Sequence, residues 1–256
     1  MPSKRFHSAL TTTAIMGCVA VLAAKGALAA EIKLIASPGV RAVVNELVPQ
    51  FEKSTGNKVS RDFAVIAVLK RRVDAGEAFD IVIPGPELID ELVKQGKIAA
   101  DTRAAFGRTG VALGVRKGAP KPDISTPENL KRTLLNAKVV GHSKEGQTGM
   151  HFLEALNRLG ILEDMRPKLR ALAGGEDSSA MRKGELDILA SGMGVIMEMP
   201  EADFVGGLPP EVQGYVKFAI GVSAASKEPE AARALVRFLT SPAVTPTFNA
   251  KGMERD

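Results

Sequence analysis

The chain has 256 residues, of which 45% are hydrophobic, and it carries 34 Lys and Arg against 29 Asp and Glu. Its one cysteine, Cys18, excludes an internal disulfide and a metal site built from several thiolates. Three of the basic residues and none of the acidic ones precede residue 31, so the remainder has a net charge of only +2, which argues against a nucleic-acid-binding protein.

The first 30 residues have the pattern of a secretory signal peptide. Lys4 and Arg5 precede an uncharged, alanine-rich run from residue 9 to 24, and small residues follow it. The run is shorter than the roughly 20 residues that span a bilayer, so a retained membrane helix is the weaker interpretation. We therefore predict export from the cytoplasm, with cleavage near Ala29 or Ala30. Lipid attachment at the single cysteine is the disfavoured alternative, because the apolar segment before it is very short.

Three strand-helix units are predicted after the signal peptide. Strands are expected at residues 31–36, 58–63 and 79–83, and each is followed by an amphipathic helix that starts near residue 40, 65 or 87. The first helix places six apolar residues on one stripe and contains Pro49, which is expected to kink it. The basic cluster Lys70-Arg71-Arg72 is interpreted as a solvated helix face. Successive strand-helix units imply a parallel sheet with helices on both faces.

Two extended runs, at residues 110–115 and 215–223, are predicted to cross between two lobes. The strand-helix alternation continues between them, with short strands at residues 139–140 and 187–190. The expected helix starts are Thr126 with Pro127 in the first turn, Gly146, the pair Ser178-Ser179 and, after the second crossing, Ser226.

The order of these elements predicts an α/β fold with two lobes, each a mostly parallel sheet flanked by helices. Lobe I is expected to comprise residues 31–112 and 218–256, and lobe II residues 113–217 inserted between them. Two covalent connections between the lobes can act as a hinge.

The residues of a catalytic centre are nearly absent. Beyond the signal peptide the histidines are His142 and His151, and without cysteine neither a zinc cluster nor a Cys-His pair can form. Ser143 beside His142 does not make a Ser-His pair, because adjacent residues of a strand or helix do not face each other. No nucleotide-binding glycine motif has the required spacing. We therefore predict that the protein is not an enzyme and holds neither a cofactor nor a metal.

Loops that lead into helices are the positive signal, because each helix start exposes unpaired N–H groups and the positive end of its dipole. Two such starts that face each other across a cleft can bind an anion. The candidates are Ser37, the Gln147-Thr148-Gly149 run and the Ser178-Ser179 pair. Each has an alternative interpretation as an ordinary helix N-cap.

At these loops the sequence resembles the periplasmic molybdate-binding-type proteins over essentially its whole length after the signal peptide. The resemblance rests on segments in the same order and spacing, namely Ile35-Ala-Ser37, Phe51 to Gly56, Phe79 to Ile83, Asp90 to Gly96, Val111 to Gly118, Gly149 to Gly160, Gly184 to Asp187 and Phe238 to Pro242.

The resemblance implies a two-lobed type II periplasmic binding fold that serves an ABC importer and holds its ligand with serine hydroxyls and backbone N–H groups. By position, Ser37 would donate its hydroxyl and its N–H, Thr148 beside Gly149 would be a backbone donor, and Ser178 falls near another. Together with their neighbours, the predicted ligand-binding residues are Ser37, Pro38, Ala64, Val65, Gln147, Thr148, Gly149, Ser178, Gly192 and Met193.

Two departures from the family pattern bear on the ligand. Ala64-Val65-Ile66 replaces the loop with the family's second serine, and Ser191-Gly192-Met193 replaces the segment with its tyrosine. A dehydrated oxyanion needs many donors, and each missing one costs about 1–3 kcal/mol. A cleft with Val65, Ile66 and Met193 in its wall suits a small organic acid better than molybdate.

These observations predict a monomeric, periplasmic solute-binding protein that captures a small anion, either an oxyanion or an organic acid, and delivers it to the membrane permease of an ABC importer. A sensor that presents the ligand to a signalling receptor is the alternative. Known enzymes on this fold, hydroxymethylbilane synthase and thiaminase, rely on a cysteine that this chain lacks after Cys18.

Overall fold

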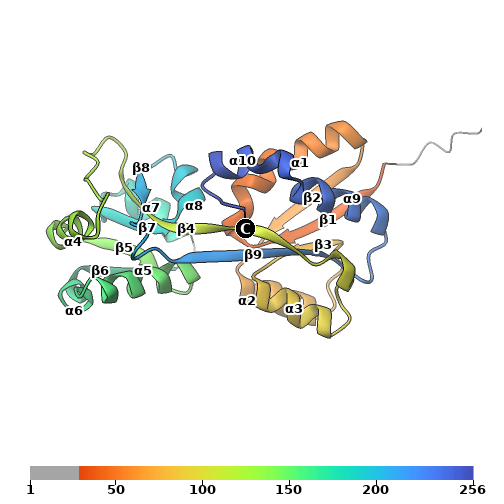
Figure 1. The fold of residues 1–256 in the computed structure, drawn as a ribbon, viewed down its shortest axis with the longest axis horizontal. Helices are drawn as coiled ribbons and strands as arrows, with labels where there is room; N and C mark the ends of the chain where they lie inside the picture. The colour runs from red at the N-terminus through yellow and green to blue at the C-terminus, as the bar shows by residue number, and fades with distance from the viewer. Residues whose placement is uncertain (1–28, 174, 256) are drawn as a thin grey trace, which may run out of the picture.

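Two long strands, β4 (Ala104–Arg116) and β9 (Tyr215–Val222), connect two lobes in the computed structural model, which describes residues 29–173 and 175–255 (Figure 1). The predicted signal peptide and Cys18 therefore lie outside the described residues, apart from Ala29 and Ala30. Within the described residues nine strands form one mixed sheet in the order β2-β1-β3-β9-β4-β7-β5-β6, with β8 paired to β4. No described helix is long and apolar enough to cross a membrane.

Lobe I is built on three parallel strands, β1 (Glu31–Ala36), β2 (Lys58–Phe63) and β3 (Ile81–Ile83), with β1 in the centre. Successive strand residues point to opposite faces, so Leu34 and Ala36 belong to one core and Ile35 to another. The helices on the first face are α1 (Arg41–Thr55), α9 (Pro229–Thr240) and α10 (Thr245–Ala250), and those on the second are α2 (Ile66–Asp74) and α3 (Pro86–Lys94).

Lobe II repeats this arrangement around three parallel strands, β5 (Val140–Ser143), β6 (Leu169–Leu172) and β7 (Ile188–Gly192). One face is covered by α4 (Pro127–Asn136), α5 (Gln147–Arg158) and α6 (Leu162–Met165). The other face is covered by α7 (Glu176–Arg182), α8 (Met193–Met197) and β8 (Ala202–Gly207).

The 13-residue strand β4 belongs to both lobes. Its first part, Ala104 to Gly110, pairs with β9, and its second part, from Val111 onward, pairs with β7 and β8. At its other end β9 pairs with β3. The two crossing strands predicted from the sequence are therefore part of the fold, and β4 is longer than the extended run that predicted it.

Most strand-helix units appear where the sequence pattern places them. Helix α1 continues through Pro49 and ends at Gly56, which adopts the left-handed conformation (φ 78°). The Thr126 hydroxyl accepts a hydrogen bond from the Asn129 N–H and caps α4, as predicted. The cap of α9, in contrast, is Glu228 and not Ser226, whose hydroxyl donates to Asp80.

The basic cluster of α2 is tied into surface ion pairs. Lys70 lies near Asp74 and Glu91, and Arg72 forms ion pairs with Asp62 and Glu77. These contacts fit the interpretation of a polar helix face. They lie on lobe I.

The C-terminal segment packs against the crossing strand. Arg108 and Glu254 exchange backbone hydrogen bonds of 2.8 Å, and their side chains form an ion pair. The Thr109 hydroxyl donates to the Gly252 carbonyl at 2.9 Å, and the Arg108 guanidinium lies over the Tyr215 ring. The segment thus connects lobe I to β4 where this strand leaves lobe I (Figure 1).

Candidate functional site

The carboxyl ends of the parallel strands define the site. The strands of lobe I end at Ala36, Phe63 and Ile83, and those of lobe II end at Ser143, Leu172 and Gly192. In sheets of this kind, ligands bind outside the carboxyl ends of the strands. Because Gly192 pairs with Val111, where β4 enters lobe II, the lobe II edge faces lobe I.

A cavity of about 310 Å³ lies between the two edges. Most of its lining comes from lobe I, including Ile66 and Ala67 at the start of α2, and Gln147 at the start of α5 contributes from lobe II. The N–H groups of these three residues have no partner among the described residues, since the first intrahelical donors are Val68 in α2 and Gly149 in α5. Amino ends of helices from both lobes therefore meet at one cavity with their donors unpaired.

Three acidic or basic side chains also line this cavity. Lys70 and Glu91 form an ion pair with each other, whereas Glu87 of α3 has no ion pair among the described residues. Neither Ser37 nor Thr148 is among the lining residues. Ser37 reaches the same lobe I edge through its hydrogen bond to Ile83, and Thr148 is the neighbour of Gln147.

Ser37 supplies one donor to the edge and not two. Its backbone N–H donates to the Ile83 carbonyl at 2.9 Å, so the predicted role of this N–H in ligand binding is wrong. The residue is only 8% exposed, and its hydroxyl makes no hydrogen bond to described residues. No fully buried side-chain oxygen or nitrogen in the described part lacks a partner, so this hydroxyl opens to solvent. Pro38 has no N–H to donate, but the Gly39 N–H has no acceptor in the part of the chain that the structure describes.

Ala64 and Val65 form the loop between β2 and α2. The Ala64 N–H is used within the sheet, where it donates to the Ala36 carbonyl at 3.0 Å. Val65 is the N-cap of α2 and is 51% exposed, which is unusual for a large apolar residue in this chain. The loop therefore presents an apolar surface at the cleft and no hydroxyl.

The start of α5 depends on Gly149. A Cβ atom at this position would lie 1.9 Å from the Ser143 carbonyl oxygen, so only glycine fits. Ser143 also accepts a hydrogen bond on its hydroxyl from the Gly146 N–H. This tight turn between β5 and α5 directs the N–H groups of Gln147 and Thr148 out of the helix.

The structure does not bring Ser178 to the site. Helix α7 begins at Glu176, two residues before the predicted start, and the Ser178 hydroxyl donates to Glu201 at 2.7 Å. Glu201 precedes β8, whose first residue pairs with Arg116 at the end of β4 farthest from the cleft. The hydroxyl is thus turned away from the strand edge.

Gly192 and Met193 lie at the edge but offer little to a ligand. A Cβ atom at Gly192 would contact the methyl groups of Thr148 and Thr109, at 3.6 and 3.7 Å, so these residues lie together. The end of the Met193 side chain packs beside Gly110 and would meet a Cβ there at 3.1 Å. The Met193 side chain thus packs on the crossing strand, and its predicted role in the cleft wall stays a prediction.

The structure also places two charged residues at these edges that the sequence did not identify. Arg41, the first residue of α1, holds its guanidinium carbon 4.7 Å from the centre of the Phe63 ring, at the end of β2. Asp177 lies in the first turn of α7, where burial, together with the charge of Glu176, raises the pKa of its carboxyl. Arg41 could have been found from its place one turn after Ser37, because helical side chains point back toward the amino end.

The two histidines have structural partners. His142 is a buried residue of β5 whose Nδ1 lies 3.0 Å from the Ser143 carbonyl oxygen, and its ring packs near Phe152. His151 forms a contact of 3.1 Å with Glu154 on the surface of α5. Neither ring contacts the Ser143 hydroxyl, and no group of acidic, histidine or cysteine side chains in the described residues could hold a metal ion.

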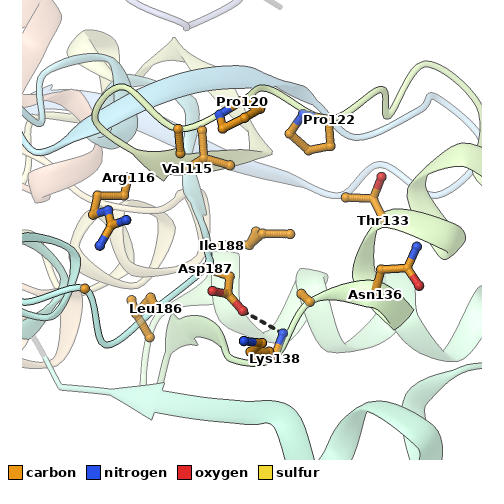
Figure 2. Close-up of a pocket in the computed structure, with 13 residues that line it drawn as sticks. Val115, Arg116, Pro120, Pro122, Thr133, Asn136, Lys138, Leu186, Asp187 and Ile188 are labelled. Carbon is orange, nitrogen blue, oxygen red and sulfur yellow. Dashed lines mark hydrogen bonds between the residues drawn. The ribbon is translucent and has the colours of Figure 1, made fainter.

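A larger cavity, of about 470 Å³, lies at the far end of lobe II (Figure 2). It is lined by the end of β4, at Val115 and Arg116, and by the start of β7, at Ile188. Its carboxylate, Asp187, accepts hydrogen bonds from the backbone N–H groups of Lys138 and Val139. This cavity therefore lies at the end of lobe II opposite to the carboxyl ends of its parallel strands. Its larger volume does not make it the candidate site, because ligands bind at the carboxyl ends.

Comparisons with known proteins agree with this architecture. The chain is 28% identical over 231 residues to an aconitate isomerase of Pseudomonas sp, with 87% of each chain covered. It is 24% identical over 239 residues to the molybdate-binding protein ModA of Azotobacter vinelandii, covering 90% of this chain and 92% of that protein. The solved periplasmic molybdate-binding protein of Azotobacter vinelandii superposes with a TM-score of 0.72 at 15% identity, over 88% of this chain and 99% of that one.

The fold is therefore the two-lobed type II periplasmic binding fold that the sequence pattern predicted. A family model described as bacterial extracellular solute-binding protein matches residues 32–254, which is nearly all of the described chain. This chain belongs to the bacterial extracellular solute-binding protein family.

Proposed function

We propose that the protein captures a small organic acid anion between its lobes and delivers it to the membrane permease of an ABC importer. The observation that supports this most directly is the inter-lobe cavity, where the amino ends of α2 and α5 present unpaired N–H groups from both lobes. Such donors and the positive ends of the helix dipoles stabilise an anion without a full opposite charge.

The composition of the edge favours an organic acid over molybdate. Ala64 and Val65 occupy the loop between β2 and α2, the Ser37 N–H is already bonded, and Ser178 faces away from the edge. A tetrahedral oxyanion would keep several acceptors unsatisfied, at about 1–3 kcal/mol each. Exposed Val65 is better matched by the carbon part of a carboxylic acid.

Delivery to a permease, a periplasmic location and a monomeric state complete the proposal. Membership of an extracellular solute-binding family and the signal-like pattern of residues 1–30 support the location. Two lobes joined by two strands can close around a ligand, and the closed form is what a permease would bind. A ligand-presenting sensor is distinguished from a transporter by an uptake assay in cells with the gene deleted.

Ligand screening tests the proposal. The protein would be purified from the periplasm after export with its own N-terminal segment, and its thermal midpoint measured with molybdate, sulfate and mono-, di- and tricarboxylates. A ligand at 100 times its dissociation constant adds about 2.7 kcal/mol of stability. We expect stabilisation by carboxylates and little by molybdate. Tight molybdate binding with no response to any carboxylate would refute the proposal.

The isomerase relative supports a second candidate function. An enzyme that isomerises a small unsaturated acid by moving a proton needs a side chain that can accept and return that proton. Asp177 is partly buried at the lobe II edge, and burial raises the pKa of its carboxyl. Incubation with cis- or trans-aconitate, followed by separation of the two forms, tests this function. If the wild type interconverts the two forms and Asp177→Asn does not, the isomerase function replaces the binding-protein proposal. If the protein binds aconitate stoichiometrically without converting it, the binding-protein proposal is supported.

A further inference from the structure

Arg41 is a positively charged residue at the amino end of α1, and it has no acidic partner there in the described part of the chain. The first turn of this helix contains no acidic residue, and Arg41 forms no ion pair with any described residue. A positive charge at a helix amino end is unfavourable by about 0.3–1 kcal/mol, because it opposes the helix dipole. Apart from its contact with the Phe63 ring, Arg41 has no electrostatic partner among the described residues, and an anionic ligand would supply one.

The position of the guanidinium is set by Phe63. The guanidinium carbon lies 4.7 Å from the ring centre, and Phe63 is the last residue of β2, paired with Ala36 of β1. Ser37 follows Ala36 directly, so the stacked guanidinium, the open Ser37 hydroxyl and the unpaired Gly39 N–H share one corner of the lobe I edge. Stacking on a ring leaves the N–H groups at the guanidinium edge free for a carboxylate.

A second anion-binding corner lies on lobe II. The unpaired N–H groups of Gln147 and Thr148 are its donors, and Gln147 lines the same cavity as Ile66. Val65 and Ile66, which begin α2, contribute apolar surface between the two corners, and the cavity is also lined by the Lys70–Glu91 ion pair and by Glu87. A ligand that satisfies both corners has a short carbon skeleton with an anionic group at each end.

We propose that Arg41 binds one carboxylate of the ligand and that the cleft thereby selects acids with at least two carboxylates, one for each lobe. This inference rests on the proposed function. It adds a recognition residue and a ligand class, and both can be wrong while the protein still binds a carboxylate.

Isothermal titration with acids that differ in carboxylate number tests the inference. The probes are butyrate, succinate and propane-1,2,3-tricarboxylate, at one ionic strength. The variants are Arg41→Ala, Arg41→Lys and the control Lys53→Ala, which removes an exposed cation about 18 Å along the same helix. The thermal midpoint of each ligand-free variant shows that it is folded.

We expect the wild type and Lys53→Ala to bind succinate and the tricarboxylate more tightly than butyrate. Arg41→Ala should weaken the two larger acids by about 10- to 100-fold and remove most of their advantage over butyrate, since a hydrogen bond to a charged group is lost. Arg41→Lys should retain part of the affinity, because it keeps the charge without the bidentate geometry. The ligand-free midpoint of Arg41→Ala should not fall.

Two results would overturn the proposal in different ways. If Arg41→Ala and Arg41→Lys keep the wild-type preference for succinate over butyrate, Arg41 is not the selective residue, and the proposed binding function stands. If the wild-type protein binds none of the three acids, the proposed function itself fails.

Discussion

Three residues near the strand edges have surroundings that do not stabilise the fold, namely Arg41, Ser37 and Asp177. Arg41 adds charge to the positive end of a helix, the Ser37 hydroxyl has no partner among the described residues, and the carboxyl of Asp177 is partly buried beside Glu176. Such local conflicts between a residue and its surroundings are concentrated at functional sites. They identify the edges more specifically than any motif in the chain.

Ser37→Ala should separate stability from binding. The hydroxyl bonds to no described residue, so we expect its removal to change the free energy of unfolding by less than about 0.5 kcal/mol. Affinity for a bound carboxylate should fall about tenfold or more, because a donor to a charged group is lost. Titration calorimetry and urea unfolding measure the two effects. Ser54→Ala, at the far end of α1, is the control, and an equal loss of affinity in both variants would contradict the assignment.

Asp177→Asn should stabilise the protein at neutral pH. The folded state raises the pKa of this carboxyl, mainly through burial, so ionisation is less favourable in the folded than in the unfolded chain. Its contribution to stability is present below the unfolded pKa and is lost as pH rises through the folded pKa. The gain in the variant should therefore be seen at pH 7 and disappear in acid.

Urea unfolding of wild type and Asp177→Asn across this pH range provides the measurement. Glu198→Gln, which alters an exposed carboxylate at the end of α8, serves as the control. A variant that is less stable than wild type at pH 7 would show that the Asp177 carboxylate has a stabilising partner.

At the scale of elements, the turn between β5 and α5 decides whether lobe II can offer donors. Glycine at position 149 lets the helix start against the Ser143 carbonyl, and the first two N–H groups then remain free. Helix α5 has 12 residues and a packed face that includes Phe152 and Leu156, so its position is well supported. Helix α8, with only five residues, contributes packing on the crossing strand.

Gly149→Ala should damage this turn. A Cβ atom 1.9 Å from the Ser143 oxygen forces the backbone to move, which we expect to cost about 1–3 kcal/mol or more and to weaken ligand binding. Gly206→Ala is the matched control, because its Cβ would meet only Ile124, at an ordinary 3.6 Å. Unfolding midpoints of the two variants provide the test, and equal values would mean that the turn relaxes without cost.

At the scale of the whole molecule, β4 and β9 are the only segments through which the chain passes from one lobe to the other within the described residues. The C-terminal segment packs on β4 through Arg108 and Glu254, and Gly252 lies against the start of α8, where a Cβ would be 2.7 Å from the Cβ of Met193. Lobe I and lobe II are therefore in contact at the C-terminal segment, through β4 and the start of α8.

Ligand binding should bring the lobes together. We expect the radius of gyration from small-angle X-ray scattering to decrease when a saturating carboxylate is added, because both corners of the cleft then bind one ligand. The decrease should be absent for Arg41→Ala at the same ligand concentration if this variant is unsaturated. A wild-type radius that stays constant while calorimetry shows saturation would contradict lobe closure.

Much of the architecture was predictable from local patterns. The apolar stripe from Val40 to Phe51, the buried run at Ile81–Ile83 and the cap at Thr126 are each encoded within a single helix or strand or its flanking residue, so local patterns reveal them. The short elements α6, β6, α8 and β8 were not predicted, because four to six residues contain too little periodicity. The start of α7 was misplaced because Gly175, and not a serine, precedes its first turn.

The sequence by itself determined the class of fold and the two crossings, and it indicated the loops that we propose as the ligand site, because these depend on local hydrogen bonding and on the order of elements. The tertiary structure decided which loop atoms are free. Ser37 lost its N–H to Ile83, Ser178 turned toward Glu201, and Arg41 was placed over Phe63. Each outcome depends on a partner at least 22 residues away, and no local pattern specifies whether a donor is already bonded when the sheet and its helices have packed.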